Sequence, residues 1–403
     1  MIARDATRLV YVPLIGFLPP GTRTLAKSAE STVDGTRLIV LAVAASPDRT
    51  DAVVEWERAG DPATCPPGSR ILAYSVRAPL DEGVSASLLI GSKELTATAM
   101  TQRGYHGSVP NIGAIHALTF PRLPQEAGGA ELQVREDARE WRVALTLGPS
   151  QIAAMPVAAK VERGGIVVRA TAIARHEDQI IVELEVEAQL QIRQVAAPAP
   201  TPMRYAALNE EDHRLRVQEL RRFFADQATP ITLEDDRGEQ VEEIGRLLPQ
   251  GHEGTVLGKP FVSRFPVMFG APRTGLHSAA VVVPFVELND RQPSVTADLR
   301  ELPLDLELGE HRFRVTAMEQ HGADQRKIFM EIPPSTGAPR FVQPARLQGS
   351  DPAFAWMRHA VDRPSRDADQ IWMATEVGDP PIVTFHGAVL RVDGPWRLEL
   401  PSA

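Results

Sequence analysis

The chain has 403 residues, of which 43% are hydrophobic and 24% are charged, and its formal net charge is −9. This composition is typical of a folded globular protein, and the length allows two to four domains with their own cores. The mild negative charge argues against a binder of duplex nucleic acid, which needs a basic surface against the phosphates. Cys65 is the single cysteine, which excludes an intrachain disulfide and a cysteine-based zinc site.

The first strongly apolar segment covers residues 9–18 and is interrupted by Pro13. It is much shorter than the ~20 residues that a membrane-spanning helix requires. It also lacks a cleavage site of the signal-peptide type. We therefore expect residues 1–30 to form an N-terminal strand segment that packs on the first module. The alternative is that a membrane helix precedes this segment in the native protein.

A pattern of turn, strand, turn and strand recurs three times, and each copy begins at glycine. Repetition at this spacing predicts tandem β-sandwiches rather than one large core. We predict three immunoglobulin-like sandwiches, at residues 31–150, 155–303 and 304–403. The copies are Asp34-Gly35 before residues 38–41 and 52–56, Gly164-Gly165 before residues 166–168 and 180–186, and Gly309 before residues 313–315 and 327–332.

The first module contains a predicted hairpin at residues 86–99. The glycine-rich residues 103–113 predict an exposed loop. The module ends in a strand in which Trp141, Val143 and Leu145 share one face. Such alternation indicates a strand that is buried on one side.

The second module contains the clearest two-residue period, because residues 182–187 alternate valine or leucine with glutamate. The glutamate row indicates a solvated strand face that also discourages pairing at a sheet edge. Residues 208–224 predict a helix, although part of this segment alternates as a strand would. Residues 231–238 predict a strand and a tight turn. A buried strand near residue 280 contains Pro284, which is unsuited to a central ladder.

The third module begins with residues 304–308, where leucine alternates with acidic residues as in a strand. Residues 352–359 predict a short helix. The module closes with a strand that starts at Trp396, much as the first module closes with Trp141. We place both tryptophans, and Trp56, in the cores. The predicted fold class is therefore all-β, with one or two short helices in loops.

Three segments carry a resemblance to a known family: residues 12–19, residues 233–238, and residues 120–124 together with 141–143. With them the chain resembles the tandem immunoglobulin-like regions found outside the membrane in bacterial anti-sigma-factor-like proteins. The resemblance covers most of the chain and implies a β-sandwich fold without known catalytic residues. Such proteins usually carry a membrane helix and a cytoplasmic segment upstream, and neither is part of this sequence.

Two pairs of residues are candidates for ligand contact. Tyr105 and His106 lie in the predicted glycine-rich loop, where their rings would be exposed. Trp356 and Trp372 lie in irregular sequence and are the tryptophans that we expect to be exposed. A plain surface loop is the alternative for Tyr105 and His106.

Asp235 and Asp236, close to Gly238, offer hard oxygen ligands to calcium, the one candidate cofactor of this chain. The alternative is a β-turn in which the aspartates bond their own backbone.

The sequence contains none of the common catalytic or nucleotide-binding motifs built on glycine, serine, lysine or histidine. The ten histidines are dispersed, and no two have the spacing that directs a pair of imidazoles at one metal. We therefore predict that the chain is not an enzyme.

The favoured function is that of an extracytoplasmic sensor, scaffold or adhesion module of a bacterial envelope protein. It would bind a protein partner or itself, no nucleic acid, and a membrane only through a segment outside this chain. One alternative is a carbohydrate-binding or glycan-active accessory protein. Another is a self-assembling subunit of a surface layer or filament.

Overall fold

The computed structural model describes residues 9–59, 84–108, 111–136, 138–197, 229–235, 237–246, 260–270, 279–320, 326–334, 337–347, 370–374, 377 and 380–401. Every regular element in these ranges is a β-strand, so the predicted all-β fold is confirmed. The helices predicted at 208–224 and 352–359 lie outside the described residues. The strands form antiparallel sheets of twelve, ten and four strands. The immunoglobulin-like assignment stays a prediction.

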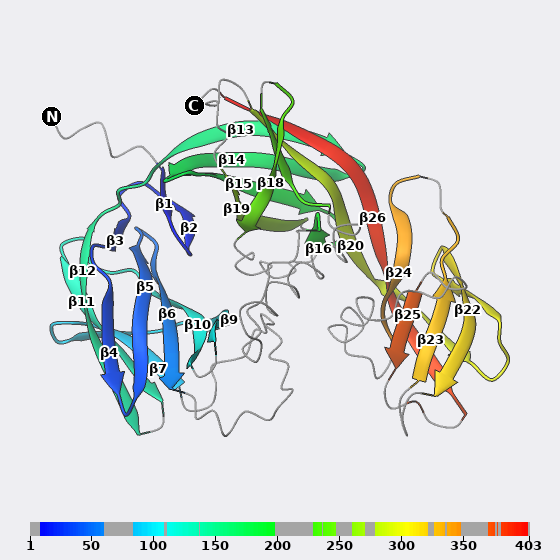
Figure 1. Cartoon of the computed structure of the whole chain (residues 1–403), viewed down its shortest axis with the longest axis horizontal. Coiled ribbons are helices and arrows are strands. Elements are labelled where there is room, and N and C mark those ends of the chain that lie inside the picture. Colours follow the sequence, from blue (N-terminus) through cyan, green and yellow to red (C-terminus); the bar gives the residue numbers. More distant parts are fainter. Residues whose placement is uncertain are drawn as a thin grey trace.

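The strands are arranged as an arch with a β-sandwich at each foot and one across the top (Figure 1). The ten-stranded sheet makes the first foot, shown in blue and cyan. It folds over so that its strands share one core, in which the Trp141 ring is buried and its Nε1 donates to the Thr36 carbonyl at 3.0 Å. Its strands are β3 (Arg23–Leu25), β4 (Ala29–Val33), β5 (Thr36–Ala45), β6 (Arg49–Ala59), β7 (Val84–Ile90), β8 (Lys93–Thr96), β9 (Ala99–Ser108), β10 (Asn111–Pro121), β11 (Gly129–Glu136) and β12 (Arg139–Pro149).

The second sandwich forms the top of the arch (Figure 1). The predicted alternation of residues 182–187 is confirmed, because Val182, Leu184 and Val186 are fully buried in its core. Its strands are β13 (Ala153–Arg163), β14 (Ile166–His176), β15 (Gln179–Ala188), β16 (Gln191–Val195), β17 (Thr232–Asp235), β18 (Gln240–Arg246) and β19 (Phe261–Gly270).

Two long strands, β20 (Ala279–Asp298) and β26 (Ile382–Leu400), run from the second sandwich into the third. They pair from Ala279 opposite Leu400 to Asp298 opposite Ile382. Pro284 lies where the register of β20 shifts, which accommodates a residue without an N–H in a central strand. The remaining strands of the third sandwich are β21 (Leu304–Leu308), β22 (His311–Gln320), β23 (Arg326–Glu331), β24 (Arg340–Leu347) and β25 (Gln370–Ala374).

One continuous core fills the second and third sandwiches. It contains Trp396, which pairs with Val283 of β20, and Phe313, whose ring contacts that of Phe385 on β26 with 5.1 Å between centroids. The predicted second and third modules therefore share two strands and a core. Because independent motion needs a boundary that few contacts cross, these two sandwiches form one mechanical unit.

A hairpin of β1 (Leu9–Val12) and β2 (Gly16–Leu18) joins the first sandwich to the second. Leu9 pairs with Ala154, so β1 extends the sheet of β13. The side chains alternate between two small cores, which explains why residues on both faces of this segment are apolar. One core joins Val12, Ile15 and Leu18 to Ala42, Ala44 and Val53 of the first sandwich, and the other joins Tyr11 to Ala154, Ala174 and Ile181 of the second.

Tyr11 provides a spectroscopic test of this packing. Burial raises the pKa of Tyr11 from 10.0 to about 12. A raised pKa means that the folded state favours the neutral phenol, so the associated stability is complete below pH 10 and is lost as the pH rises toward 12. Ultraviolet titration should therefore show a late-ionising tyrosine that Tyr11→Phe removes. If the variant keeps the late transition, Tyr11 does not have this environment.

The three predicted repeats share an irregularity that the sequence does not reveal. Each is a three-stranded meander: β4–β5–β6, β13–β14–β15 and β21–β22–β23. In every copy the middle strand is bulged five residues after its start, at Leu41, Thr171 and Thr316. A bulge increases local twist and redirects a side chain. The recurrence supports the prediction that these segments are structural repeats.

The exposed loop predicted at residues 103–113 is wrong. Residues 103–108 and 111–113, the described part of this segment, belong to β9 and β10, which pair with Tyr105 opposite Ala114 and His106 opposite Gly113. Glycine is depleted in strands as a class, but here the long ladder between β6 and β10 provides the template for β9. Non-local pairing therefore overrides the local preference for a loop.

Candidate functional site

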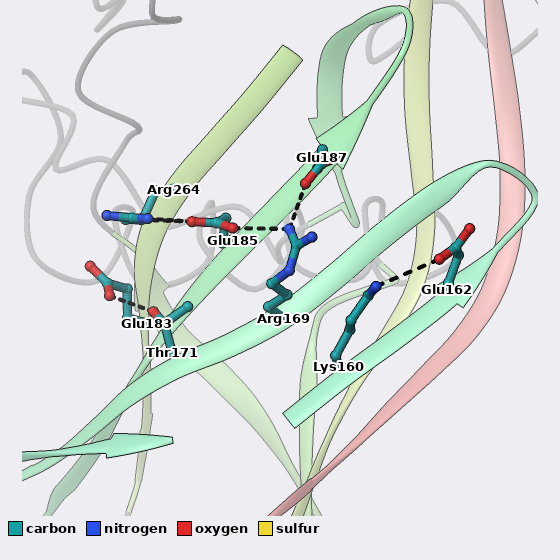
Figure 2. A network of polar contacts seen from close by, with 8 residues as sticks. All are labelled: Lys160, Glu162, Arg169, Thr171, Glu183, Glu185, Glu187 and Arg264. Carbon is teal, nitrogen blue, oxygen red and sulfur yellow. Dashed lines mark hydrogen bonds and ion pairs between the residues drawn. The ribbon is translucent and has the colours of Figure 1, made fainter. Parts of the chain in front are cut away.

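A strip of charged side chains crosses the second sandwich on the face turned away from its core (Figure 2). We call it the charged strip. Because successive side chains of a strand point to opposite faces, burial of Val182 and Leu184 directs the intervening glutamates onto this face. The strip consists of Lys160 and Glu162 from β13, Arg169 and Thr171 from β14, Glu183, Glu185 and Glu187 from β15, and Arg264 from β19.

Glu185 is the centre of the strip. Its carboxylate accepts hydrogen bonds from Arg169 Nη1 at 3.0 Å and from Arg264 Nε at 3.2 Å. Arg169 Nη1 also lies 2.7 Å from Glu187, and this bond is the main cause that raises the pKa of Arg169. The side chain of Glu185 is 14% exposed, whereas that of Arg264 is 58% exposed. Four residues from three adjacent strands are therefore linked into one ordered network (Figure 2).

Glu183 has a different environment at one end of the strip. Its carboxylate accepts a hydrogen bond from the hydroxyl of Thr171, the bulged residue of β14. Burial raises the pKa of Glu183, and the bond from Thr171 and the charge of Arg264 counteract this shift only in part. Glu183 pairs with Pro266, whose ring would lie 3.4 Å from a Cβ at Gly16 of the β1–β2 hairpin. The charged strip thus begins beside the hairpin.

Neutralising Glu183 and neutralising Glu185 should have different effects on the free energy of unfolding. Because the pKa of Glu183 is raised, its ionisation costs stability as the pH rises through the folded-state value. Glu183→Gln should therefore leave the free energy of unfolding at pH 7 unchanged or higher. Glu185→Gln removes the charge that holds two arginines. It should lower the free energy of unfolding by about 0.5–1 kcal/mol. Urea denaturation of both variants at pH 5 and pH 7 measures the difference, and equal losses would contradict these environments.

The strip combines ordered charges of both signs on the sheet face turned away from the core, which suits recognition of another surface. Charges that are already held in place lose little side-chain entropy on binding, and their pattern selects a partner of complementary charge. Within the ranges that the structure describes, no three histidine, cysteine, aspartate or glutamate side chains are placed to hold a metal ion.

The structure places the predicted ligand-contacting residues apart from this strip. Tyr105 and His106 lie on β9 of the first sandwich, and a ligand role for them stays a prediction. The predicted exposure of Trp372 is wrong, because the side chain is 2% exposed in the core shared by the second and third sandwiches. A ring that is buried in this way offers no face to a saccharide. Trp356 lies outside the described residues.

Asp235 lies at the end of β17, at the predicted tight turn. Its Oδ1 accepts hydrogen bonds from the backbone N–H groups of Arg237 at 2.9 Å and Glu239 at 2.8 Å. These are the contacts of a turn in which an aspartate bonds its own backbone, the alternative to a calcium site. Asp236 lies outside the described residues.

The sequence indicated the glutamates of the strip but not their partners. Arg169 and Arg264 are 16 and 79 residues from Glu185. The register of β14 and β19 against β15 brings them together. The only sign of the strip in the sequence was the alternation of glutamate with valine or leucine in β15.

No family model matches the chain, and no curated protein matches it. One solved structure is similar, described as the crystal structure of the conserved domain protein from Bacillus anthracis. It has 13% sequence identity and a TM-score of 0.30, over 68% of this chain and 81% of that chain. Among the described residues, no helix has the length and apolar character to cross a membrane.

Proposed function

We propose that this chain is a non-enzymatic scaffold outside the cytoplasm, part of a bacterial envelope protein, that presents protein-binding surfaces in a fixed arrangement. The proposal rests on the observation that each sandwich is mechanically coupled to the next one. β20 and β26 run through both the second and third sandwiches, and the β1–β2 hairpin packs on both the first and second. Flexible linkers allow domains to move, whereas shared strands and cores fix their separation.

The charged strip supports protein recognition as the task of this scaffold. It lies on the sandwich at the top of the arch, between the two feet (Figures 1 and 2). A partner with the opposite order of charges would replace solvent on this face without forcing its side chains into a new arrangement.

The location is tested with the product of the complete native gene. A tag at the C-terminus of the chain should be accessible to protease in cells with a permeabilised outer surface and intact cytoplasmic membrane. Protection of the tag until that membrane is lysed would refute an extracytoplasmic scaffold.

Partner binding is tested by photo-crosslinking in the same cells. A crosslinking amino acid in place of Lys160, whose side chain is 52% exposed at the edge of the strip, should give a discrete adduct. The same amino acid in place of Glu94, exposed on β8 of the first sandwich, is the matched control. Equal patterns from both positions would refute recognition through the strip.

A further inference from the structure

A second polar face lies on four strands that neighbour one another in the order β16–β20–β26–β24. One side of these strands contributes to the shared core through Ile192, Leu288, Leu390 and Phe341. The other side carries a group that we call the arginine face. It consists of Arg193, Glu287, Arg340, Gln343, Arg391 and Asp393, with Phe285 beneath Arg391.

Two arginines face each other across neighbouring strands in this group. Arg340 of β24 is directly opposite Arg391 of β26. Like charges in this position repel each other and destabilise a sheet unless another group compensates. Asp393 compensates in part, because it accepts hydrogen bonds from Arg340 Nε at 3.0 Å and from Arg391 Nε at 2.9 Å.

The orientation of these two guanidinium groups leaves donors available. Each contacts Asp393 through Nε, and the described part of the structure gives their terminal nitrogens no other hydrogen-bond partner. The Arg391 guanidinium carbon lies 3.7 Å from the centroid of the Phe285 ring, which fixes its plane. Among the described residues, Asp393 and Phe285 thus hold two neighbouring guanidinium groups whose terminal nitrogens have no hydrogen-bond partner.

Arg193 brings a third guanidinium to the same face. It occupies the register shift of β16 between Ile192 and Gln194. With the Gln343 amide oriented so that its oxygen faces Arg193, that oxygen accepts from Nη1 at 2.6 Å and Nη2 at 3.2 Å. Burial lowers the pKa of Arg193, and the charge of Glu287 opposes this shift. A buried guanidinium with a neutral amide as its hydrogen-bond partner favours a further anion.

The arginine face carries an excess of positive charge. Three arginines and two carboxylates, Glu287 and Asp393, give a formal charge of +1 (3 − 2) in a chain whose net charge is −9. Burial raises the pKa of Glu287, so that its charge is the easier of the two to lose.

We propose that the arginine face binds a phosphate-type oxyanion, held by the terminal nitrogens of Arg340 and Arg391 with Arg193 as the third donor. Guanidinium groups match the oxygens of such an anion in pairs and make strong charge-assisted hydrogen bonds with them. Free phosphate and the phosphoryl group of a lipid share this chemistry. A ligand here would join β16 to β24 across four strands of the scaffold.

The test uses the full chain and inorganic phosphate, with sodium chloride at equal ionic strength as the reference. Phosphate should raise the melting temperature of the wild type, and calorimetry should give a saturable isotherm. Arg340→Gln should weaken binding at least about tenfold, and Arg340→Glu should abolish it. Without phosphate, Arg340→Gln should be as stable as the wild type, because it removes a repulsive pair and its side chain is 39% exposed.

Arg312→Gln is the matched control, because Arg312 is an exposed arginine paired with Glu307 on β21. This variant should bind phosphate as the wild type does. The proposal is overturned if phosphate has no effect beyond that of chloride, or if Arg340→Gln and Arg312→Gln respond alike.

Vesicles distinguish the two sources of the phosphate group. A protein that uses a lipid headgroup should sediment with phosphatidic acid vesicles but not with phosphatidylcholine vesicles, and Arg340→Gln should abolish this. Phosphate binding without vesicle binding identifies a free anion as the ligand. Binding to neither overturns the site.

Discussion

Replacing Arg246 with methionine is expected to lower the free energy of unfolding by about 3–5 kcal/mol. Arg246 forms an ion pair with Glu243 on β18, and the Glu243 side chain is 1% exposed. Arg246 also donates to the Val195 carbonyl, at the end of β16. Removing the arginine leaves a buried carboxylate without its counter-charge, which costs far more than loss of an exposed pair. Urea denaturation measures the change.

Two variants distinguish the effect of the unpaired carboxylate from the effect of removing any arginine. The double variant Arg246→Met with Glu243→Gln should recover most of the stability, because glutamine has no charge and keeps an oxygen for the Ile231 N–H, which now lies 3.0 Å from Glu243 Oε1. Arg314→Met removes an exposed pair with Asp305 and should cost less than about 1 kcal/mol. If the double variant is no more stable than Arg246→Met, the unpaired charge is not the cause.

Tyr11→Ala is expected to cost about 3–5 kcal/mol, the usual range for truncation of a buried aromatic residue. The Tyr11 side chain is 3% exposed and packs on Ala154, Ala174 and Ile181 of the second sandwich. Its ring also contacts that of Phe17, with 5.2 Å between centroids. The cavity therefore opens where the hairpin contacts the second sandwich. Thermal unfolding measures the loss.

Tyr11→Phe is the control for this position, because it keeps the ring and removes only the hydroxyl. It should change stability by less than about 0.5 kcal/mol at pH 7. A loss from Tyr11→Ala no larger than that from an exposed substitution would mean that the hairpin does not pack on the second sandwich.

Local sequence patterns predicted many of the strands because each pattern reflects a local physical requirement. Alternation at residues 182–187 requires one buried face, and β15 has it. The turn at Gly164-Gly165 needs positive φ at both residues, which glycine adopts without strain, and both have it. Trp141 and Trp396 are each fully buried, as alternation with apolar neighbours predicted.

Features that depend on distant pairing could not be predicted in the same way. Nothing within residues 279–298 indicates that β20 pairs with β26 about a hundred residues later. Burial of Trp372 could not be predicted either, because the sequence around it shows no regular pattern. The residue is buried because β25 pairs with β23 in the core. In the sequence, the only sign of the two-sided burial of the hairpin was that residues 9–18 are mostly apolar.

The charged strip was predictable from the sequence only in part. Its glutamates follow from the strand period, so the face was predictable. Arg169 and Arg264 were not, because their distance to Glu185 depends on the register of three strands. The arginine face was missed for the same reason, since Arg340 and Arg391 meet only through pairing of β24 with β26.

The most direct test of the rigid scaffold is the distance between its two feet. Spin labels at Glu94→Cys on β8 and Glu307→Cys on β21, with Cys65→Ser, can be measured by pulsed electron paramagnetic resonance. Shared strands and the two-sided hairpin predict one narrow distance distribution, which Tyr11→Ala broadens. A broad distribution in the otherwise unaltered chain would mean that the sandwiches move independently.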